Sequence, residues 1–264
     1  MSENSTSGRR PLAYKNEKFV DSPDARPLRI LSEYLEPLSH FRHEKIKDTI
    51  VFFGSARLNE TGPLARYYSE ARELAGLLTK WSDSLHNYSR RFVICTGGGP
   101  GIMEAANRGA SDVGGKTIGL NIRLPNEQEP NPYITPELSF EFHYFFLRKF
   151  WFAYLAKALV VFPGGFGTMD ELFEILTLVQ TQKLQKKMVI LLYGTKFWNE
   201  VVNFPALVKY GTISADDMNL FHFADDPQTA LTILQDDLTQ YYLQPKQRLG
   251  EPETEMPAIA KTST

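Results

Sequence analysis

Hydrophobic residues follow two alternating patterns along this chain. Short runs of consecutive apolar residues, typical of strands buried on both faces of a parallel sheet, alternate with longer segments whose apolar residues recur every three or four positions, typical of helices. The strand-like runs are 49–53, 92–96, 116–124, 140–142, 159–162, 188–193 and 221–223. The helix-like segments are 27–38, 63–81, 102–107, 145–155, 168–179, 197–210 and 226–238. This alternation predicts an α/β fold, a doubly wound parallel sheet in a single domain with an N-terminal helical extension.

Polar ends flank this patterned region. Residues 1–26 are rich in Ser, Asn, Arg and Lys and have no period, so we expect a disordered arm there. The folded domain is expected over 27–245, with its core at 49–223. The tail 246–264 is polar and contains proline, and disorder is expected again.

Composition narrows the class of protein. The 264 residues carry a net charge of -2, so no basic surface for a nucleic acid is indicated. The N-terminus lacks the apolar core of a signal peptide, and charges interrupt the longest apolar region, so no membrane span is expected. The single cysteine, Cys95, cannot form an internal disulfide, and a cytoplasmic protein is expected.

The candidate chemistry centres on the segment 158–171, in which a buried strand leads into a glycine turn and then a helix. Gly164, Gly165 and Gly167 allow a ligand to approach the main chain closely. Free N–H groups and the positive end of the helix dipole would bind a phosphate there. Thr168 is expected to start the helix, with Glu171 one turn further on. The pair Thr168 and Glu171 also fits a capping box, although a cap does not require three glycines.

Two further turns follow predicted strands. Gly54 and Ser55 end the first strand, where doubly wound folds bind ligands, although a plain strand-to-helix turn is about equally consistent with these residues. The second turn, 97–107, is glycine-rich but departs from the dinucleotide fingerprint, which argues against NAD or FAD. From its position alone, Glu104 is an acid in the first turn of the following helix, where it favours the helix dipole.

Arg148 and Lys149 lie in the otherwise apolar segment 145–155. Two adjacent cations in such surroundings need partners or an anionic ligand, because an unpaired buried charge is costly. If that end of the helix were exposed, they would be ordinary bases reaching into solvent.

The run Pro-Gly-Gly-Phe-Gly-Thr-Met-Asp-Glu at 163–171, with an Arg-Lys pair 23 residues before its Glu, resembles the LONELY GUY (LOG) family of nucleoside 5′-monophosphate phosphoribohydrolases. The resemblance covers about 49–223. It implies a Rossmann-like fold, a homodimer, and no metal or other cofactor. It also implies hydrolysis of a purine nucleoside monophosphate, AMP or an N6-modified AMP, to free base and ribose 5-phosphate.

The resemblance also implies roles for individual residues. Arg148 and Glu171 would be catalytic, and Arg148 is expected to keep Glu171 ionised by lowering its pKa. The residues implied to bind the phosphate or the rest of the nucleotide are Gly164, Gly165, Phe166, Gly167, Thr168, Lys149, Gly54, Ser55, Gly98, Gly99, Glu104 and Glu127. Glu127, in a proline-rich loop, is as consistent with a surface acid that has no role.

Two other functions stay open from the sequence. Molybdenum-cofactor carriers share the glycine turns, so a carrier that binds a nucleotide or cofactor without turnover is the alternative. Similar sequences are also labelled possible lysine decarboxylases, but no lysine lies in a recognisable pyridoxal phosphate site. Shorter LOG proteins have a His-Glu-Arg-Lys-like run where this chain has Phe-Leu-Arg-Lys, so the surroundings of Arg148 differ and the substrate can differ with them.

Overall fold

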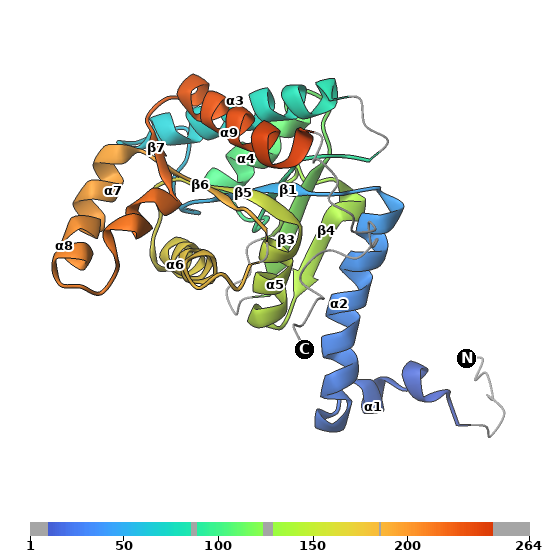
Figure 1. Ribbon diagram of the computed structural model, residues 1–264. Coiled ribbons are helices and arrows are strands. Elements are labelled where there is room, and N and C mark those ends of the chain that lie inside the picture. Colours follow the sequence, from blue (N-terminus) through green and yellow to red (C-terminus); the bar gives the residue numbers. More distant parts are fainter. Residues whose placement is uncertain (1–9, 86–88, 124–128, 185, 245–264) are drawn as a thin grey trace.

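A computed structural model describes residues 10–85, 89–123, 129–184 and 186–244. Its centre is one parallel sheet in the order β4-β3-β2-β1-β5-β6-β7 (Figure 1). The strands are β1 (Thr49–Phe53), β2 (Val93–Thr96), β3 (Thr117–Ile122), β4 (Ser139–Phe142), β5 (Ala156–Val161), β6 (Val189–Tyr193) and β7 (His222–Ala224). The predicted α/β doubly wound fold is therefore confirmed.

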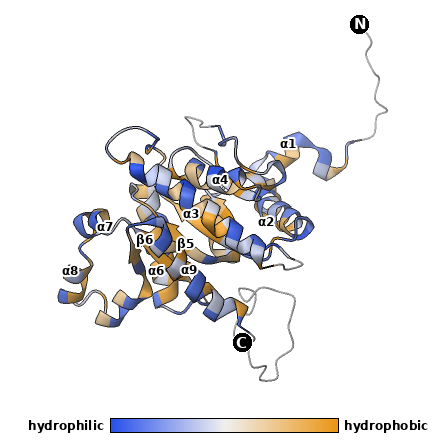
Figure 2. Cartoon of the chain, turned by 90° about the horizontal axis from the view of Figure 1, so that it is seen from above, coloured by the Kyte–Doolittle hydropathy of each residue, from blue (hydrophilic) through white to orange (hydrophobic). Residues whose placement is uncertain are grey.

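Helices cover both faces of the sheet, because the central strands are apolar on both sides. One face carries α3 (Ala65–Ser84), α4 (Ile102–Asp112) and α9 (Pro227–Leu238). The other face is covered by α2 (Arg26–His43), α5 (Phe145–Leu155), α6 (Phe166–Gln180), α7 (Thr195–Val201) and α8 (Phe204–Lys209). Hydrophobic residues gather in the sheet and hydrophilic ones on the outer helix faces (Figure 2). Burying both sheet faces supplies most of the apolar area that leaves water on folding.

The order of the strands reverses between β1 and β5. The chain runs from β1 outward through β2 and β3 to β4, then returns to β5 beside β1, with Phe53 paired to Val161 in register. Helices that follow these two strands leave on opposite faces, which opens a crevice at their carboxyl ends. Helix α5 ends at Leu155 and β5 begins at Ala156, so no loop separates them.

The N-terminal extension is mostly helical. Residues 10–25, within the segment for which the sequence predicts disorder, include two short 3₁₀ helices and α1 (Glu17–Val20), whereas 1–9 lie outside the described residues. Helix α2 follows and buries Phe41 against the domain. The apolar residues Leu28 and Leu31 stay about half exposed, so part of the predicted apolar stripe faces solvent.

Two helix boundaries differ from the expectation. Helix α6 begins at Phe166, two residues before Thr168, because the turn needs only Gly164 and Gly165 after Pro163. The segment predicted as one helix with a break at Pro205 is two helices, and Pro205 lies in the first turn of α8, where its missing N–H costs nothing. Within the described ranges, no helix combines the length and the apolar character needed to cross a bilayer.

Candidate active site

The glycine turn between β5 and α6 contains glycines of two kinds. A Cβ on Gly164 would lie 2.1 Å from Oγ1 of Thr168, so packing requires glycine there. A Cβ on Gly165 or Gly167 would meet nothing within 4 Å, and neither residue has a positive φ. Gly167 moreover lies inside α6, where glycine is about 1 kcal/mol less favourable than alanine. The fold itself therefore does not explain two of the three glycines.

Open space at these glycines faces the free end of α6. The N–H groups of Phe166, Gly167 and Thr168 precede the first hydrogen bond of the helix, from Met169 N to Gly165 O at 3.0 Å. Thr168 is the third helical residue and its side chain is packed over Gly164, so it is not the N-cap. The capping-box interpretation is therefore wrong, and Glu171 is not held back by the amide of Thr168.

Glu171 lies one turn further along α6, facing α5. Its carboxylate Oε1 is 3.7 Å from Nη2 of Arg148, and the two side chains are only 7% and 16% exposed. Nε of Arg148 is buried and has no hydrogen-bond partner. The guanidinium lies near the rings of Phe145 and Phe152, at 5.3 and 5.6 Å from their centroids. A buried donor without an acceptor in a site of this kind calls for a ligand or an ordered water.

The electrostatic balance at Glu171 differs from the expectation. Burial raises the pKa of the Glu171 carboxyl to about 7, and the charges of Lys149 and Arg148 offset only part of that effect. The prediction that Arg148 would lower this pKa was wrong in its net direction. The reason is that 3.7 Å is too long for a close ion pair, while the carboxyl loses nearly all of its water. Near neutral pH the group can therefore exchange a proton readily.

Lys149, the residue after Arg148 on α5, pairs with acids of α6. Its ammonium contacts Oδ2 of Asp170 at 2.7 Å and Oε2 of Glu174 at 2.6 Å. These two carboxylates hold Lys149 beside the acidic side of α6 and neutralise its charge. Lys149 thus lies near the glycine turn, but its ion pairs are to two acids on the first turns of α6.

The other two glycine turns meet the first one at the crevice. Ser55 N donates to Pro163 O at 3.0 Å, and Ser55 O accepts from Ile102 N at 3.1 Å. A Cβ on Gly54 would lie 2.7 Å from the side chain of Ile102. Gly54 and Ser55 thus join the ends of β1, β5 and α4, and packing accounts for Gly54.

The second turn brings Gly97 next to the arginine. A Cβ on Gly97 would lie 4.0 Å from Nη1 of Arg148. Gly98 has φ of 75° and its Cβ position overlaps the Asn121 side chain, so only glycine fits. Gly99 contributes a carbonyl that accepts from Asn131 Nδ2 at 3.1 Å.

A buried amide network that the sequence analysis did not identify holds this second turn. Asn131 is 6% exposed, and its Nδ2 donates to Gly98 O at 3.1 Å and to Asn107 Oδ1 at 3.0 Å. Asn107 Oδ1 also accepts from Thr96 Oγ1 at 2.7 Å. The turn is therefore fixed from β2, from α4 and from the segment after β3. The available signal was weak: an Asn one turn into α4 and an Asn between two prolines.

Glu104 and Glu127 are the two other carboxylates predicted to bind the nucleotide. Glu104 lies in the first turn of α4, half-buried, and accepts a hydrogen bond from the Tyr68 hydroxyl at 2.9 Å. Glu127 lies outside the described residues. Among the residues that the structure describes, no group of three or more His, Cys, Asp or Glu side chains is arranged to hold a metal ion.

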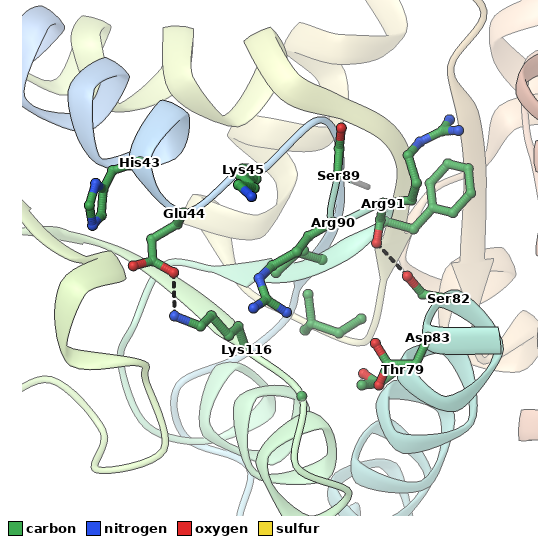
Figure 3. A pocket seen from close by; sticks show the side chains of 14 residues that line it. His43, Glu44, Lys45, Thr79, Ser82, Asp83, Ser89, Arg90, Arg91 and Lys116 are labelled. Atoms are coloured by element: carbon green, nitrogen blue, oxygen red, sulfur yellow. Dashed lines mark hydrogen bonds and ion pairs between the residues drawn. The ribbon is translucent and has the colours of Figure 1, made fainter. Parts of the chain in front are cut away.

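A separate hollow lies at the opposite end of the sheet, at the amino ends of β2 and β3 (Figure 3). It measures about 500 Å³ and its wall is charged. Its Lys116 pairs with Glu44, and Arg91 pairs with Asp48 at 2.7 Å. Two of its cations are thus neutralised by carboxylates of the same chain. Ligands of doubly wound folds bind at the other end of the strands, so we place the candidate site at the glycine turns.

Comparison with known proteins agrees with this geometry. The family model described as "Possible lysine decarboxylase" matches residues 103–234. The rice (Oryza sativa subsp. japonica) protein "Cytokinin riboside 5'-monophosphate phosphoribohydrolase LOG" is 27% identical over 203 residues, 76% of this chain and 77% of that protein. The rice protein "Probable cytokinin riboside 5'-monophosphate phosphoribohydrolase LOG4" is 30% identical over 145 residues. That match spans 54% of this chain and 61% of the LOG4 protein.

Solved structures are similar to this chain at lower identity. A structural-genomics X-ray structure of TM1055 has a TM-score of 0.50 and 20% identity, covering 72% of this chain and 99% of that one. The molybdenum cofactor binding protein of Rippkaea orientalis has a TM-score of 0.49 and 20% identity, covering 73% of this chain and 98% of that one. The family model spans half of the chain, and the chain belongs to the LOG family, whose model carries the "Possible lysine decarboxylase" description.

Proposed function

We propose that this protein hydrolyses the N-glycosidic bond of a purine nucleoside 5′-monophosphate, AMP or an N6-modified AMP, to the free base and ribose 5-phosphate. The main evidence is the buried pair of Arg148 and Glu171, in which the Arg148 Nε lacks an acceptor. This pair lies next to the start of α6, where the fold does not require Gly165 and Gly167. The rice relatives are named as cytokinin riboside 5'-monophosphate phosphoribohydrolases, and these names support the same class of substrate.

The 5′-phosphate would bind at the start of α6. The three free N–H groups there and the helix dipole favour an anion, and a Cβ at Gly165 or Gly167 would take up the open space that the phosphate needs. The ribose then extends toward Glu171, one turn along the same helix. Fixing the sugar phosphate in this way converts binding free energy into positioning of the glycosidic bond.

Cleavage of the bond builds positive charge on the ribose. An ionised Glu171 would stabilise that charge and orient or deprotonate the attacking water. A carboxyl with a pKa of about 7 suits this role, because it is both ionised in a useful fraction of molecules and basic enough to accept a proton at neutral pH. Arg148 would donate from its free Nε to the substrate while its Nη2 keeps Glu171 oriented.

The test uses purified full-length protein and AMP. We expect adenine and ribose 5-phosphate in equal amounts, and we expect Glu171→Gln and Arg148→Ala each to lower kcat by at least about a hundredfold. Glu200→Gln, an exposed acid on α7, is the matched control and should keep full activity. Normal turnover in either site variant refutes the mechanism.

A panel of AMP, N6-modified AMP, GMP, IMP and adenosine defines the substrate. Adenosine lacks the 5′-phosphate, so it should be cleaved poorly if the start of α6 provides the affinity. Tight binding of nucleotides without any product over hours would instead support the carrier function. An absorbance band of pyridoxal phosphate in the purified protein would support the decarboxylase function.

We also propose that the protein is a homodimer, because apolar residues of α5 and α6 are exposed. Phe145 and Phe146 on α5 are about half exposed, and Phe166 on α6 is 97% exposed. Met169 and Phe173 extend the apolar face along α6 next to Phe166. A second copy of the chain would cover this face. Light scattering at micromolar concentration should give twice the mass of the chain, and Phe173→Lys should halve it; a monomeric wild type contradicts the dimer.

A further inference from the structure

Helix α5, which carries Arg148, depends on the N-terminal extension for its position. The extension approaches it from the side: α2 runs past α5 and β4 (Figure 1). Residues 26–43 lie outside the region that the family model matches. The contacts between α2 and α5 are therefore features of this chain that the family comparison does not address.

Glu33 of α2 closes the start of α5. Its carboxylate accepts hydrogen bonds from two successive main-chain amides, His143 N at 2.9 Å and Tyr144 N at 3.2 Å. Tyr144 is the N-cap of α5, and no side chain of its own segment caps this helix. Glu33 thus accepts from the N-cap amide and the amide before it, more than a hundred residues away in the sequence, and places a negative charge at the start of α5, where the helix dipole favours it.

This contact leads to Arg148 through a single residue. The Tyr144 N–H is held by Glu33, and the Tyr144 carbonyl accepts from Arg148 N at 3.2 Å. One turn beyond Arg148, the Trp151 indole N–H donates to the main-chain oxygen of Glu33 at 3.1 Å. Arg148 therefore lies between two hydrogen bonds to the same residue of α2.

Aromatic packing fixes the same pair of helices. Tyr34, next to Glu33, stacks on Trp151 with ring centroids 5.6 Å apart. Phe41 meets Trp151 edge-on at 5.2 Å. These rings hold the distance between α2 and α5, whereas the Glu33 carboxylate sets where α5 begins along its axis.

We propose that Glu33 is a positioning residue for Arg148, so that the N-terminal extension is part of the active-site machinery rather than a separate appendage. This inference rests on the proposed hydrolysis for its activity readout. Arg148 meets Glu171 at 3.7 Å, and its Nη1 is 4.0 Å from where a Cβ on Gly97 would lie, so a small shift of α5 changes its position relative to both α6 and the Gly97 turn. A displacement of about 1 Å in an active site can reduce the rate on the order of a hundredfold.

The test compares three full-length variants on α2. Glu33→Gln keeps the size of the side chain but has only one oxygen acceptor for two amides. His40→Ala removes a different contact of α2 with the domain, from the ring Nδ1 to Glu137 O at 2.7 Å, and leaves α5 untouched. Glu36→Gln replaces an exposed acid on the same helix. For each variant kcat and KM for AMP, the unfolding midpoint, and hydrogen exchange of the α5 amides are measured.

We expect Glu33→Gln to lower kcat ten- to a hundredfold and to speed exchange at the start of α5, with the protein still folded. His40→Ala and Glu36→Gln should leave kcat within about twofold of the wild type. Unchanged kcat in Glu33→Gln while the wild type hydrolyses AMP overturns the inference, as does an equal loss in His40→Ala. An inactive wild type overturns the proposed function instead, and the inference is then decided by the exchange of the α5 amides alone, with unchanged exchange refuting it.

Discussion

Replacing Glu171 by glutamine tests the electrostatics of the site without any substrate. Glutamine has the shape of the protonated carboxyl, so the variant represents the protein with Glu171 permanently neutral. In the folded protein burial raises the pKa of Glu171 from 4.5 to about 7, so the folded state binds this proton more tightly than the unfolded chain does. Stability is therefore lost as pH rises through this range, and the loss is complete above pH 7.

The size of the effect follows from the two pKa values. The interval from 4.5 to about 7 corresponds to about 3 kcal/mol in full. Most of it, about 2.5 kcal/mol, falls between pH 5 and pH 8. Because the other titrating groups are common to both proteins, they cancel in the difference between wild type and Glu171→Gln, and Arg148 faces a neutral side chain in the variant at every pH.

The assay is urea unfolding of both proteins at pH 5, 6, 7 and 8. The free energy of unfolding of the wild type, minus that of Glu171→Gln, should fall by about 2.5 kcal/mol from pH 5 to pH 8. The same subtraction with Glu200→Gln, an exposed acid, should give a flat line. A difference that rises with pH would mean that the charges of Lys149 and Arg148 outweigh burial and lower the pKa of Glu171, and the argument from burial would then be wrong.

Further predictions concern the reaction and the turns. If ionised Glu171 is the reactive form, kcat/KM for AMP should rise with pH to a plateau above about 7; a decline over that range, in a pH titration of the rate, contradicts this role. Gly167→Ala should raise the free energy of unfolding by up to about 1 kcal/mol, because alanine is the better helix residue. The same variant should raise KM, because its Cβ takes up space that the phosphate needs, and a normal KM refutes the phosphate site. Gly164→Ala should destabilise by about 1–3 kcal/mol in urea unfolding, since its Cβ would overlap Thr168. Asn131→Ala should cost about 1–3 kcal/mol and lower activity, because the Gly98 turn loses its donors; full stability would show that other groups hold this turn.

The sequence predicted those features that depend on neighbouring residues. Strands and helices follow from local periodicity, and the glycine turn before α6 follows from a strand run, a proline and three glycines within ten residues. The approach of Arg148 to Glu171 was expected from the family resemblance, because nothing in the intervening residues 149–170 fixes that distance.

Features that depend on the packing of distant segments could not be predicted. The net pKa shift of Glu171 is a balance between burial and the nearby charges of Lys149 and Arg148, and neither can be read from the sequence. Asn131 reaches Gly98 across 33 residues, and Glu33 reaches Tyr144 across 111 residues. Periodicity detects which face of a segment is apolar, but it does not detect which polar side chain will meet a particular main-chain amide.

The direct passage from α5 into β5 limits how this protein can vary. One residue inserted near 155 would turn the helix by roughly 100° and would exchange the two faces of the strand. Either Arg148 would then turn away from Glu171, or the apolar side chains of β5 would lie on the opposite faces of the sheet. Variation at the junction of α5 and β5 is therefore restricted to exchanges of side chains at constant length, whereas the segment 57–64, which leads from the Gly54-Ser55 turn to α3, can change in length and reshape the mouth of the crevice.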